Sequence, residues 1–537
     1  MGASKPAPVA TRIERGRANR DRGVLSEFVR GLKARGWGER GLFLVAVCCS
    51  VIPLWLTPYP PLQDLPQHLA AIRVLHSYDD PAYGFAQFFE LHPFRTQYLA
   101  YYFVADLLSH LFDVRVANLV LLSTAIAAIP YGVRAVARGL GADGLGAWLA
   151  LPLTYNAHLI LGFFNFIAGI SLSLFGLALA LSLRRRMQRR TAVTFAVVAA
   201  LCFLTHVVPF AFLALGSVLI ALGRPVRVVV MRALPLAPAG VLAIAWFSVS
   251  PAGQATLAAA GGAEGRAVQP VHRSFDVALA ELPDWMTAVF DPARDTRLLW
   301  AWALVLVMAV ALSGLRRLRV AAEGPLAARL RWRLLLLPLL AVLAYFAAPS
   351  SYAWIWPIAP RFALLAALLT LALLPRLVRP VAGGIVLLSL ALFAAHALRA
   401  GRAFAGFGRE VGRLDDAIGS IPPGRRVAGL IFDRGSRHVR FSPFIHAVAY
   451  YQQRRGGAVM FTFADFPQSP FVFRPGNRPP RVRPRWEWLP GRVNPARDLA
   501  YYDYVLVRGG PGRIARQKKH YTRTFRSRRW SVWKRTR

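Results

Sequence analysis

The chain has 537 residues, of which 55% are hydrophobic, and its formal net charge is +40. Apolar runs of about 15–20 residues recur between Leu42 and Leu398, which excludes a soluble globular protein and predicts a polytopic α-helical membrane protein. The positive charge lies in short arginine clusters between these runs, where it orients helices. The lipid bilayer is therefore a predicted partner, and nucleic acid is not.

The first expected domain is a polar, basic cytoplasmic segment, residues 1–40. It is too long for the charged start of a signal peptide, so the apolar run after it is predicted to be retained as the first transmembrane span. A transmembrane domain follows over residues 41–399, with long outer loops at 58–114 and 251–297. Eleven spans are expected, at about 41–57, 115–133, 145–157, 164–183, 192–205, 208–222, 234–250, 298–314, 334–349, 361–375 and 381–398. Since every other connection carries an arginine cluster, the N-terminus is predicted to be cytoplasmic and the C-terminus extracytoplasmic.

The first outer loop carries the most distinctive polar residues of the chain. Its sequence "PPLQDLPQHLAAIRVL" contains Asp64 and His68, four positions apart. If a helix begins near Asp64, with Pro66 in its first turn, both side chains project from the same side. They are the candidate catalytic residues. The alternatives are that Asp64 only caps the helix and that His68 is a satisfied interfacial histidine.

Two later segments allow two interpretations. Residues 97–112 are apolar but include Asp106 and His110, which cost up to roughly 3 kcal/mol each at the bilayer centre, so we expect an interfacial helix. If this segment spans the membrane instead, the orientation of everything after it reverses. The spans between 192 and 222 could be one long helix, but Pro209 predicts a break.

Further polar and aromatic residues are predicted on the outer face. Those expected to line a substrate pocket are Gln63, Gln67, Asn165 and Trp354, and those expected to bind a phosphate are Arg361, His206 and His272. The alternatives are that Arg361 snorkels to the headgroups, that Asn165 and Trp354 pack or anchor the interface, and that His206 satisfies the broken helix.

Residues 400–537 have a different composition and are predicted to form a basic, soluble α/β domain. Helical spacing between Phe404 and Ile418 is followed by strand-like segments such as "RRVAGLIF", "AVMFTF", "YDYVLVRG" and "WSVWKR". Strands that alternate with helices predict a small, largely parallel sheet. The segment "RGGPGR" lacks the spacing of a nucleotide-binding loop and is predicted to be a turn.

The layout of residues 40–400 resembles that of the GT-C superfamily of integral membrane glycosyltransferases, in a bacterial branch. The segments that carry the resemblance are "PPLQDLPQHLA", "LILGFFNFIAG", "FLTHVVPF" and "APRFALLAALL". The resemblance implies a sugar donor linked through phosphate to a polyprenol, and a first-loop acid, here Asp64, that acts as general base or positions the acceptor and a metal. Many members carry two adjacent acids, whereas Leu65 follows Asp64 here. A divalent metal is thus allowed but not required, and the cofactor stays open.

The predicted function is transfer of a sugar from a polyprenyl-phosphate-type donor to an acceptor on the outer face of the bacterial inner membrane. One carboxylate suffices to accept the proton of the attacking group, and a cation can stabilise the leaving phosphate. The alternative is a non-catalytic membrane scaffold or a transporter of lipid-linked glycans. A transporter is expected to show internal repeats and paired polar residues within its spans, and the sequence shows few intramembrane charges and no convincing repeat.

Overall fold

The computed structural model describes residues 38–254, 269–315, 324–352, 355–479, 483, 485–510 and 512–536. The chain divides into two compact units, Met1–Cys49 and Ser50–Arg537, and the contacts described below lie within the second unit. Most of the predicted segment 1–40, part of the loop 251–297 and Trp354 lie outside the described residues.

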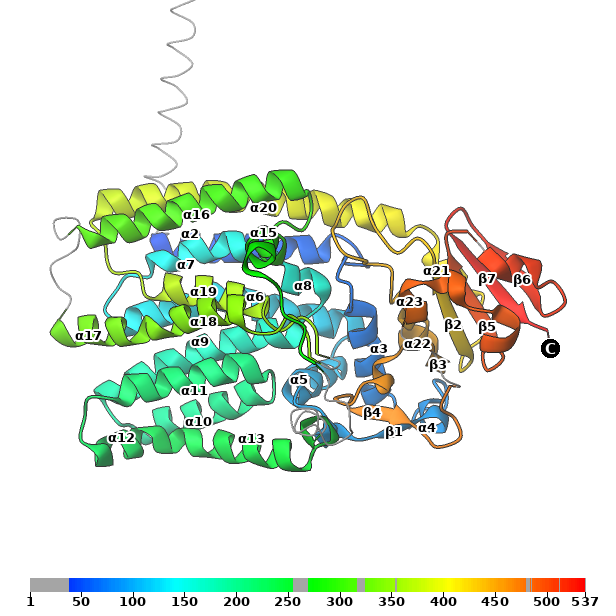
Figure 1. The fold of residues 1–537 in the computed structure, drawn as a ribbon, viewed down its shortest axis with the longest axis horizontal. Helices are drawn as coiled ribbons and strands as arrows, with labels where there is room; N and C mark the ends of the chain where they lie inside the picture. Colours follow the sequence, from blue (N-terminus) through cyan, green and yellow to red (C-terminus); the bar gives the residue numbers. More distant parts are fainter. Residues whose placement is uncertain are drawn as a thin grey trace, which may run out of the picture. The chain divides into compact units, whose positions relative to one another are not determined.

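The described part of the chain is mostly helical, and six of its helical stretches are long and apolar enough to cross a membrane. They are Val114–Gly139 (α6), Phe164–Arg185 (α9), Val226–Val249 (α12, η3 and α13), Pro292–Gly314 (α16), Pro325–Ala347 (α17 and α18) and Arg379–Val411 (α20). Figure 1 shows many of these helices running side by side, with the C-terminal sheet at one end of the bundle. The predicted class, a multi-pass helical membrane protein, is confirmed.

Shorter helices occupy the remaining predicted spans. They are Glu39–Trp55 (α2), Leu145–Ala150 (α7), Arg189–Phe203 (α10), Val207–Ala221 (α11) and Arg361–Ala372 (α19). A 12-residue helix such as α19 is only about 18 Å long, whereas the hydrocarbon core is roughly 30 Å thick. The count of eleven spans is therefore not established by helix length.

The predicted span at 145–157 is not a single continuous helix. Helix α7 gives way to a 3₁₀ turn at Leu151–Leu153 (η2), and a separate helix follows at Ala157–Leu161 (α8). Pro152 lacks an amide donor, and the side chain of Asn156 accepts a hydrogen bond from the Leu159 amide at 3.1 Å, so the chain stops one helix and starts another. The predicted break near Pro209 is confirmed, because α10 ends at Phe203 and α11 begins at Val207.

The two longest helices of the first outer loop are Leu65–His76 (α3) and Leu99–Ser109 (α5). Eleven residues of α5 span about 16 Å, too little to cross a bilayer. Three exposed apolar side chains follow one another at four-residue spacing along one side of α5 and just beyond it: Phe103, Leu107 and Leu111. This arrangement fits the expected interfacial helix. The other short elements of the two outer loops are Phe85–Phe88 (α4), Phe89–Leu91 (β1), Pro93–Arg95 (η1) and Phe275–Trp285 (α15).

The C-terminal region contains a five-stranded mixed sheet in the order β3-β2-β5-β7-β6. Its strands are Arg426–Ile431 (β2), Ala458–Val459 (β3), Tyr504–Arg508 (β5), Tyr521–Arg526 (β6) and Trp530–Arg535 (β7). Strand β2 is parallel to β3 and β5, in register Val427↔Tyr504, whereas β7 is antiparallel to β5 and β6. The prediction of a largely parallel sheet is thus corrected, because the chain returns after β5 through an antiparallel pair whose first strand, β6, is mostly exposed and rich in Arg and Thr.

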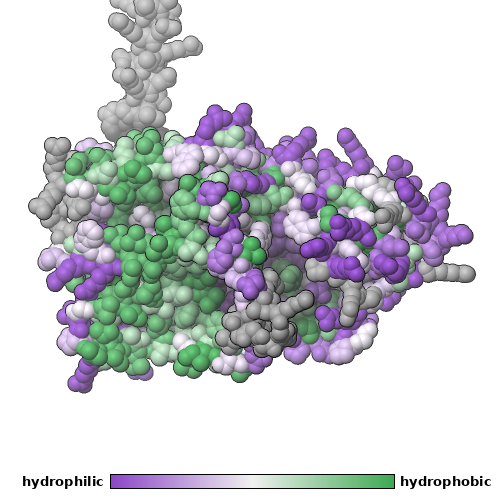
Figure 2. All heavy atoms as spheres, in the orientation of Figure 1, coloured by the Kyte–Doolittle hydropathy of each residue, from purple (hydrophilic) through white to green (hydrophobic). Residues whose placement is uncertain are grey.

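Short helices and turns surround this sheet. They are Leu414–Gly419 (α21), Ala449–Arg455 (α22), Phe463–Asp465 (η5), Arg485–Trp488 (α23), Pro490–Arg492 (η6), Pro495–Asp498 (α24) and Gly512–Arg516 (η7). Side chains from β2, β5 and β7, including Leu430, Val507 and Trp533, share one buried hydrophobic cluster. Figure 2 shows hydrophobic side chains covering much of the helical bundle and hydrophilic ones covering the C-terminal region. Only 6% of the apolar stretch within Val226–Val249 is buried, as expected for a surface that faces lipid.

The C-terminal region packs against the first outer loop. Helix α20 continues without interruption from Arg379 to Val411, past residue 400. Strand β1 of the loop pairs antiparallel with Phe471–Phe473 (β4), and the hydroxyl of Tyr59 donates a hydrogen bond to Asp415 at 2.5 Å. The sequence did not predict this pairing, and it brings a C-terminal segment next to the candidate catalytic residues.

Candidate active site

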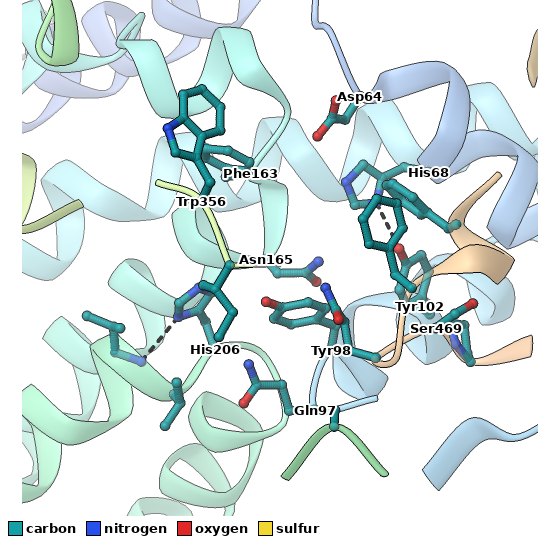
Figure 3. A pocket seen from close by; sticks show the side chains of 18 of the residues that line it. Asp64, His68, Gln97, Tyr98, Tyr102, Phe163, Asn165, His206, Trp356 and Ser469 are labelled. Atoms are coloured by element: carbon teal, nitrogen blue, oxygen red, sulfur yellow. Dashed lines mark hydrogen bonds between the residues drawn. The ribbon is translucent and has the colours of Figure 1, made fainter. Parts of the chain in front are cut away.

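A cavity of about 380 Å³ lies where the first outer loop, the start of α9, the α10–α11 break, the start of α19 and a C-terminal segment meet (Figure 3). This volume is within the range of small-molecule sites. Five of the nine residues predicted from the sequence line it: Asp64, His68, Asn165, His206 and Arg361. Residues from Phe463 to Pro470 supply another part of the wall, so the C-terminal region completes the cavity.

Arg361 is the charged residue at the start of α19, and it is 8% exposed. Its guanidinium lies 5.2 Å from the ring centre of Phe163 and 6.0 Å from that of Phe166. Among the described residues no carboxylate pairs with it, and its Nε atom is buried without a hydrogen-bond partner. Because an unpaired buried charge is costly, this guanidinium is suited to receive an anion in the cavity. Arg361 does not reach solvent as a snorkelling side chain would.

His206 and Asn165 also present unpaired polar atoms. His206 caps α11, because its Nδ1 accepts a hydrogen bond from the Val208 amide at 3.1 Å. This bond assigns the proton to Nε2, which is buried and has no partner in the described part of the chain. Asn165 Oδ1 is likewise buried and unpaired. The cavity therefore offers donors and acceptors that a polar ligand can satisfy.

Asp64 is the N-terminal flanking residue of α3, as predicted, but its side chain makes no capping hydrogen bond. The carboxylate instead lies 3.1 Å from Nδ1 of His446. The backbone of Asp64 packs against Gly162, whose φ is +98° and where an added Cβ would lie 2.7 Å from the Asp64 Cβ. Only glycine fits this position without strain. The Asp64 side chain therefore does not cap the helix, and the capping alternative is not supported.

The partner of Asp64, His446, comes from the C-terminal region and was not predicted as a site residue. Its Nε2 lies 3.1 Å from Glu487, so the imidazole lies between two carboxylates that are each 17% exposed. Burial alone lowers the pKa of His446, but the charges and hydrogen bonds of Glu487 and Asp64 outweigh burial and raise the pKa to about 10. The ring is therefore a cation at neutral pH, and it holds the Asp64 carboxylate in place.

His68 makes two hydrogen bonds within the protein. Its Nε2 lies 3.0 Å from the carbonyl oxygen of Gly162, and its Nδ1 lies 3.0 Å from the Tyr102 hydroxyl. The carbonyl can only accept, so Nε2 carries the proton and Nδ1 accepts from Tyr102. Burial lowers the pKa of His68 to about 4. Both ring nitrogens are therefore engaged, and the neutral ring joins Gly162 to Tyr102 beneath Asp64. The predicted catalytic role of His68 stays a prediction.

The remaining predicted site residues do not line this cavity within the described structure. The Gln63 side chain accepts a hydrogen bond from the Ser442 amide at 3.1 Å, and the Gln67 side chain donates one to the carbonyl of Phe461. Both glutamines therefore bind the C-terminal region. His272 is exposed and lies outside the cavity. Trp354 lies outside the described residues, while Trp356, two positions later, lines the cavity (Figure 3).

Taken together, the site combines a carboxylate held by a cationic histidine, a buried guanidinium without a counter-charge in the described structure, and a largely apolar wall that includes Val207, Trp246 and Phe247. A carboxylate can accept a proton from a nucleophile. A guanidinium can bind a phosphate through two hydrogen bonds. An apolar wall suits a hydrocarbon chain.

No protein-family model and no curated protein sequence matches the chain. Among solved structures, the fold is similar to that of the arabinofuranosyltransferase AftD from Mycobacteria, with a TM-score of 0.50 and 16% identity over 93% of this chain and 40% of that chain. ArnT from Cupriavidus metallidurans matches over 93% of this chain and 98% of its own, with TM-scores of 0.44 both in the apo state, at 14% identity, and bound to undecaprenyl phosphate, at 13% identity. The chain spans about two fifths of the length of AftD. The predicted resemblance is thus confirmed as a similarity of fold to one membrane glycosyltransferase, AftD.

Proposed function

We propose that the chain is a membrane glycosyltransferase that moves a sugar from a polyprenyl-phosphate-type donor to an acceptor on the outer face of the membrane. The observation that carries this proposal is Arg361, a buried cation without an acidic partner in the described structure, in the cavity that Asp64 also lines. The fold likeness to a glycosyltransferase, AftD, supports the same class of activity.

The proposed chemistry assigns each residue a task. Asp64 accepts the proton of the attacking hydroxyl while the bond between the sugar and the phosphate breaks. Arg361 binds the phosphate and stabilises the charge that develops on it as it leaves, and the Nε2 proton of His206 donates a further hydrogen bond. Asn165 and Gln97, each with a buried unpaired oxygen, accept hydrogen bonds from sugar hydroxyls.

The lipid part of the donor explains why the cavity is mostly apolar. Its first isoprene units would lie against Val207, Trp246 and Phe247, and the rest of the chain would stay in the bilayer. Burial of each CH₂ group contributes about 0.8 kcal/mol, so a short stretch of prenyl chain adds several kcal/mol to donor affinity. A water-soluble nucleotide sugar would leave this wall without a function.

The membrane arrangement is part of the same proposal. The eleven apolar segments cross the bacterial inner membrane, with residues 1–40 in the cytoplasm. Residues 41–399 form the transmembrane domain, and residues 400–537 form a domain outside the cytoplasm. This orientation puts the cavity, the first outer loop and His446 on one side, where a lipid-linked sugar and its acceptor meet.

The test is the variant Asp64→Asn assayed for sugar transfer from a polyprenyl-phosphate donor. Asn keeps the size of the side chain but cannot accept the proton, so turnover is expected to fall by roughly 100-fold to 10,000-fold while the protein accumulates normally in the membrane. The matched control is Asp79→Asn, an exposed acid of the same loop that is expected to retain wild-type turnover. Transfer by Asp64→Asn at the rate of the control would overturn the assignment.

A further inference from the structure

A second group of polar side chains lies outside the cavity, between the far ends of helices α3 and α5. It consists of His76 at the end of α3, with Asp106 and His110 in and just after the last turn of α5. We propose that these three residues form a binding site for a divalent transition metal of the Zn²⁺ class, which would join the two helices.

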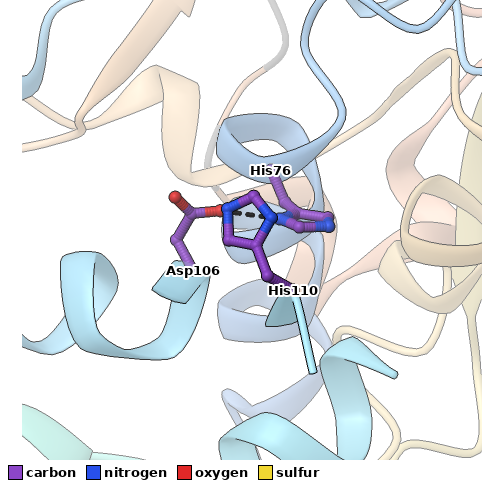
Figure 4. A group of neighbouring side chains, drawn as sticks. All are labelled: His76, Asp106 and His110. Atoms are coloured by element: carbon purple, nitrogen blue, oxygen red, sulfur yellow. Dashed lines mark hydrogen bonds and ion pairs between the residues drawn. The ribbon is translucent and has the colours of Figure 1, made fainter. Parts of the chain in front are cut away.

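The geometry of the group supports metal binding. The three ligand atoms all lie within 4.8 Å of one another, and His76 Nδ1 is 2.9 Å from Asp106 Oδ1. The rings of His76 and His110 have their centres 4.7 Å apart. Figure 4 shows the three side chains converging from the two helices. Ligand bonds of about 2.0–2.2 Å around a tetrahedral ion place neighbouring ligand atoms roughly 3.3–3.6 Å apart, so small side-chain rotations suffice to close the site.

The types of ligand indicate which metals the site prefers. Two imidazoles and one carboxylate form a common set for Zn²⁺, which then takes water as a fourth ligand. Imidazole favours Zn²⁺, Ni²⁺, Co²⁺ and Cu²⁺ over Ca²⁺ and Mg²⁺, which prefer six or more oxygens. Asp106 and His110 are four apart, so their side chains lie on the same side of α5. The exposed apolar side chains of this segment, Phe103, Leu107 and Leu111, occupy other positions, so they do not compete with the two ligands.

The nearby cation Arg73 does not oppose a bound metal ion. Arg73, one turn before His76 on α3, pairs with Asp113 at 3.2 Å, so its charge is compensated locally. His76 and Asp106 are partly buried, with side-chain exposures of 17% and 31%, whereas His110 is exposed. The exposed side gives the metal a route of entry and space for a bound water.

The place of the site in the fold suggests a structural role. Helices α3 and α5 meet near their first turns, where His68 and Tyr102 form the hydrogen bond beneath Asp64. A metal at their far ends would fix the same two helices a second time, about 12 Å along α3 from His68. The ion would thereby hold the framework of the cavity without touching its contents.

The experiment measures Zn²⁺ binding to the purified full-length protein in detergent after metal removal with a chelator and dialysis. Calorimetric titration with Zn²⁺ alone is expected to give about one tight site per chain. The variants His76→Ala, His110→Ala and Asp106→Asn are each expected to weaken it by more than about 100-fold, because each removes or neutralises a direct ligand. The matched control is His520→Ala, an exposed histidine of the C-terminal region, which should bind as wild type.

A second readout identifies the ligands and separates lost binding from misfolding. Co²⁺ in place of Zn²⁺ should give the visible absorption of a tetrahedral nitrogen and oxygen site, and His110→Ala should abolish it. His110 is exposed, so this variant should fold and elute as the wild type does. The proposal is overturned if the wild type takes up no Zn²⁺ or Co²⁺ at micromolar concentration, or if His76→Ala and His110→Ala bind both ions with wild-type affinity.

Discussion

Replacing His446 with Gln tests whether the C-terminal region holds the candidate catalytic carboxylate. The imidazole lies 3.1 Å from Asp64 and 3.1 Å from Glu487, and Gln keeps a polar side chain but removes the positive charge. Removing one partner of a buried ion pair costs roughly 3–5 kcal/mol. A His446 pKa that rises from 6.5 to about 10 corresponds to roughly 5 kcal/mol of interaction that favours the charged ring. The cost of removing the imidazole and the interaction that favours its charged form are therefore of similar size.

The pH dependence of this effect has a definite sign. The pKa of His446 is higher in the folded protein than in the unfolded chain, so its contribution is complete below about pH 6.5 and is lost as the pH rises through about 10. The stability difference between wild type and His446→Gln should therefore be largest near pH 6 and should shrink as the pH approaches 10. Tryptophan fluorescence during thermal unfolding in detergent can measure it, with the exposed His520→Gln as the control.

The variant should also lose most of its sugar transfer at neutral pH, because Asp64 would no longer be held by a cation. Glu487→Gln provides a graded comparison, since it leaves the pair between His446 and Asp64 intact and should lose less activity. A wild-type Tm for His446→Gln at pH 6, or a Tm difference that stays constant up to pH 10, would refute the ion-pair reasoning.

Three other results are expected. Gly162→Ala should cost about 1–3 kcal/mol of stability and most of the transfer activity, because the φ of +98° at Gly162 and the nearby Asp64 leave no room for a Cβ. Transfer and thermal-unfolding assays test this prediction, and wild-type values in both would contradict it. Arg361→Gln should weaken donor binding, measured by titration, by roughly 10- to 100-fold, while the stability without ligand stays within about 1 kcal/mol of wild type, because the guanidinium has no acidic partner in the described structure. A large loss of stability with unchanged donor affinity would indicate a structural role instead. Reporter fusions after Arg190 and Arg232 should report cytoplasm and fusions at Tyr83 and Arg437 should report the outside; a cytoplasmic Arg437 with an external Tyr83 would show that one assigned span is wrong.

Much of the cavity was predictable because its residues interrupt apolar sequence. Asp64, Asn165, His206 and Arg361 all stand at the ends of hydrophobic runs, where a polar side chain is conspicuous. His272, which was chosen for its expected place in the long outer loop 251–297, is exposed and lies outside the cavity. Polarity at the membrane boundary therefore identified candidates without showing which of them face the same space.

The contribution of the C-terminal region could not be predicted in the same way. His446 and Glu487 lie about forty residues apart in the basic C-terminal region, in "PFIHAVAYY" and "RWEWLP". Their contact with each other and that of His446 with Asp64 depend on how distant parts of the chain pack. The pairing of β1 with β4 involves only three residues on each strand, too few for a clear periodic pattern. The division of residues 145–157 depends on Pro152 and Asn156, whose local signals were outweighed by the surrounding hydrophobicity.

The most direct test of the central proposal is an electron cryo-microscopy structure of the protein in lipid nanodiscs with a polyprenyl phosphate added. The proposal predicts density for the phosphate against the guanidinium of Arg361, near His206 Nε2, with the prenyl chain along Val207 and Trp246 and with Asp64 facing the space that the sugar would occupy. A polyprenyl phosphate bound elsewhere, with the cavity filled only by water, would contradict the proposal.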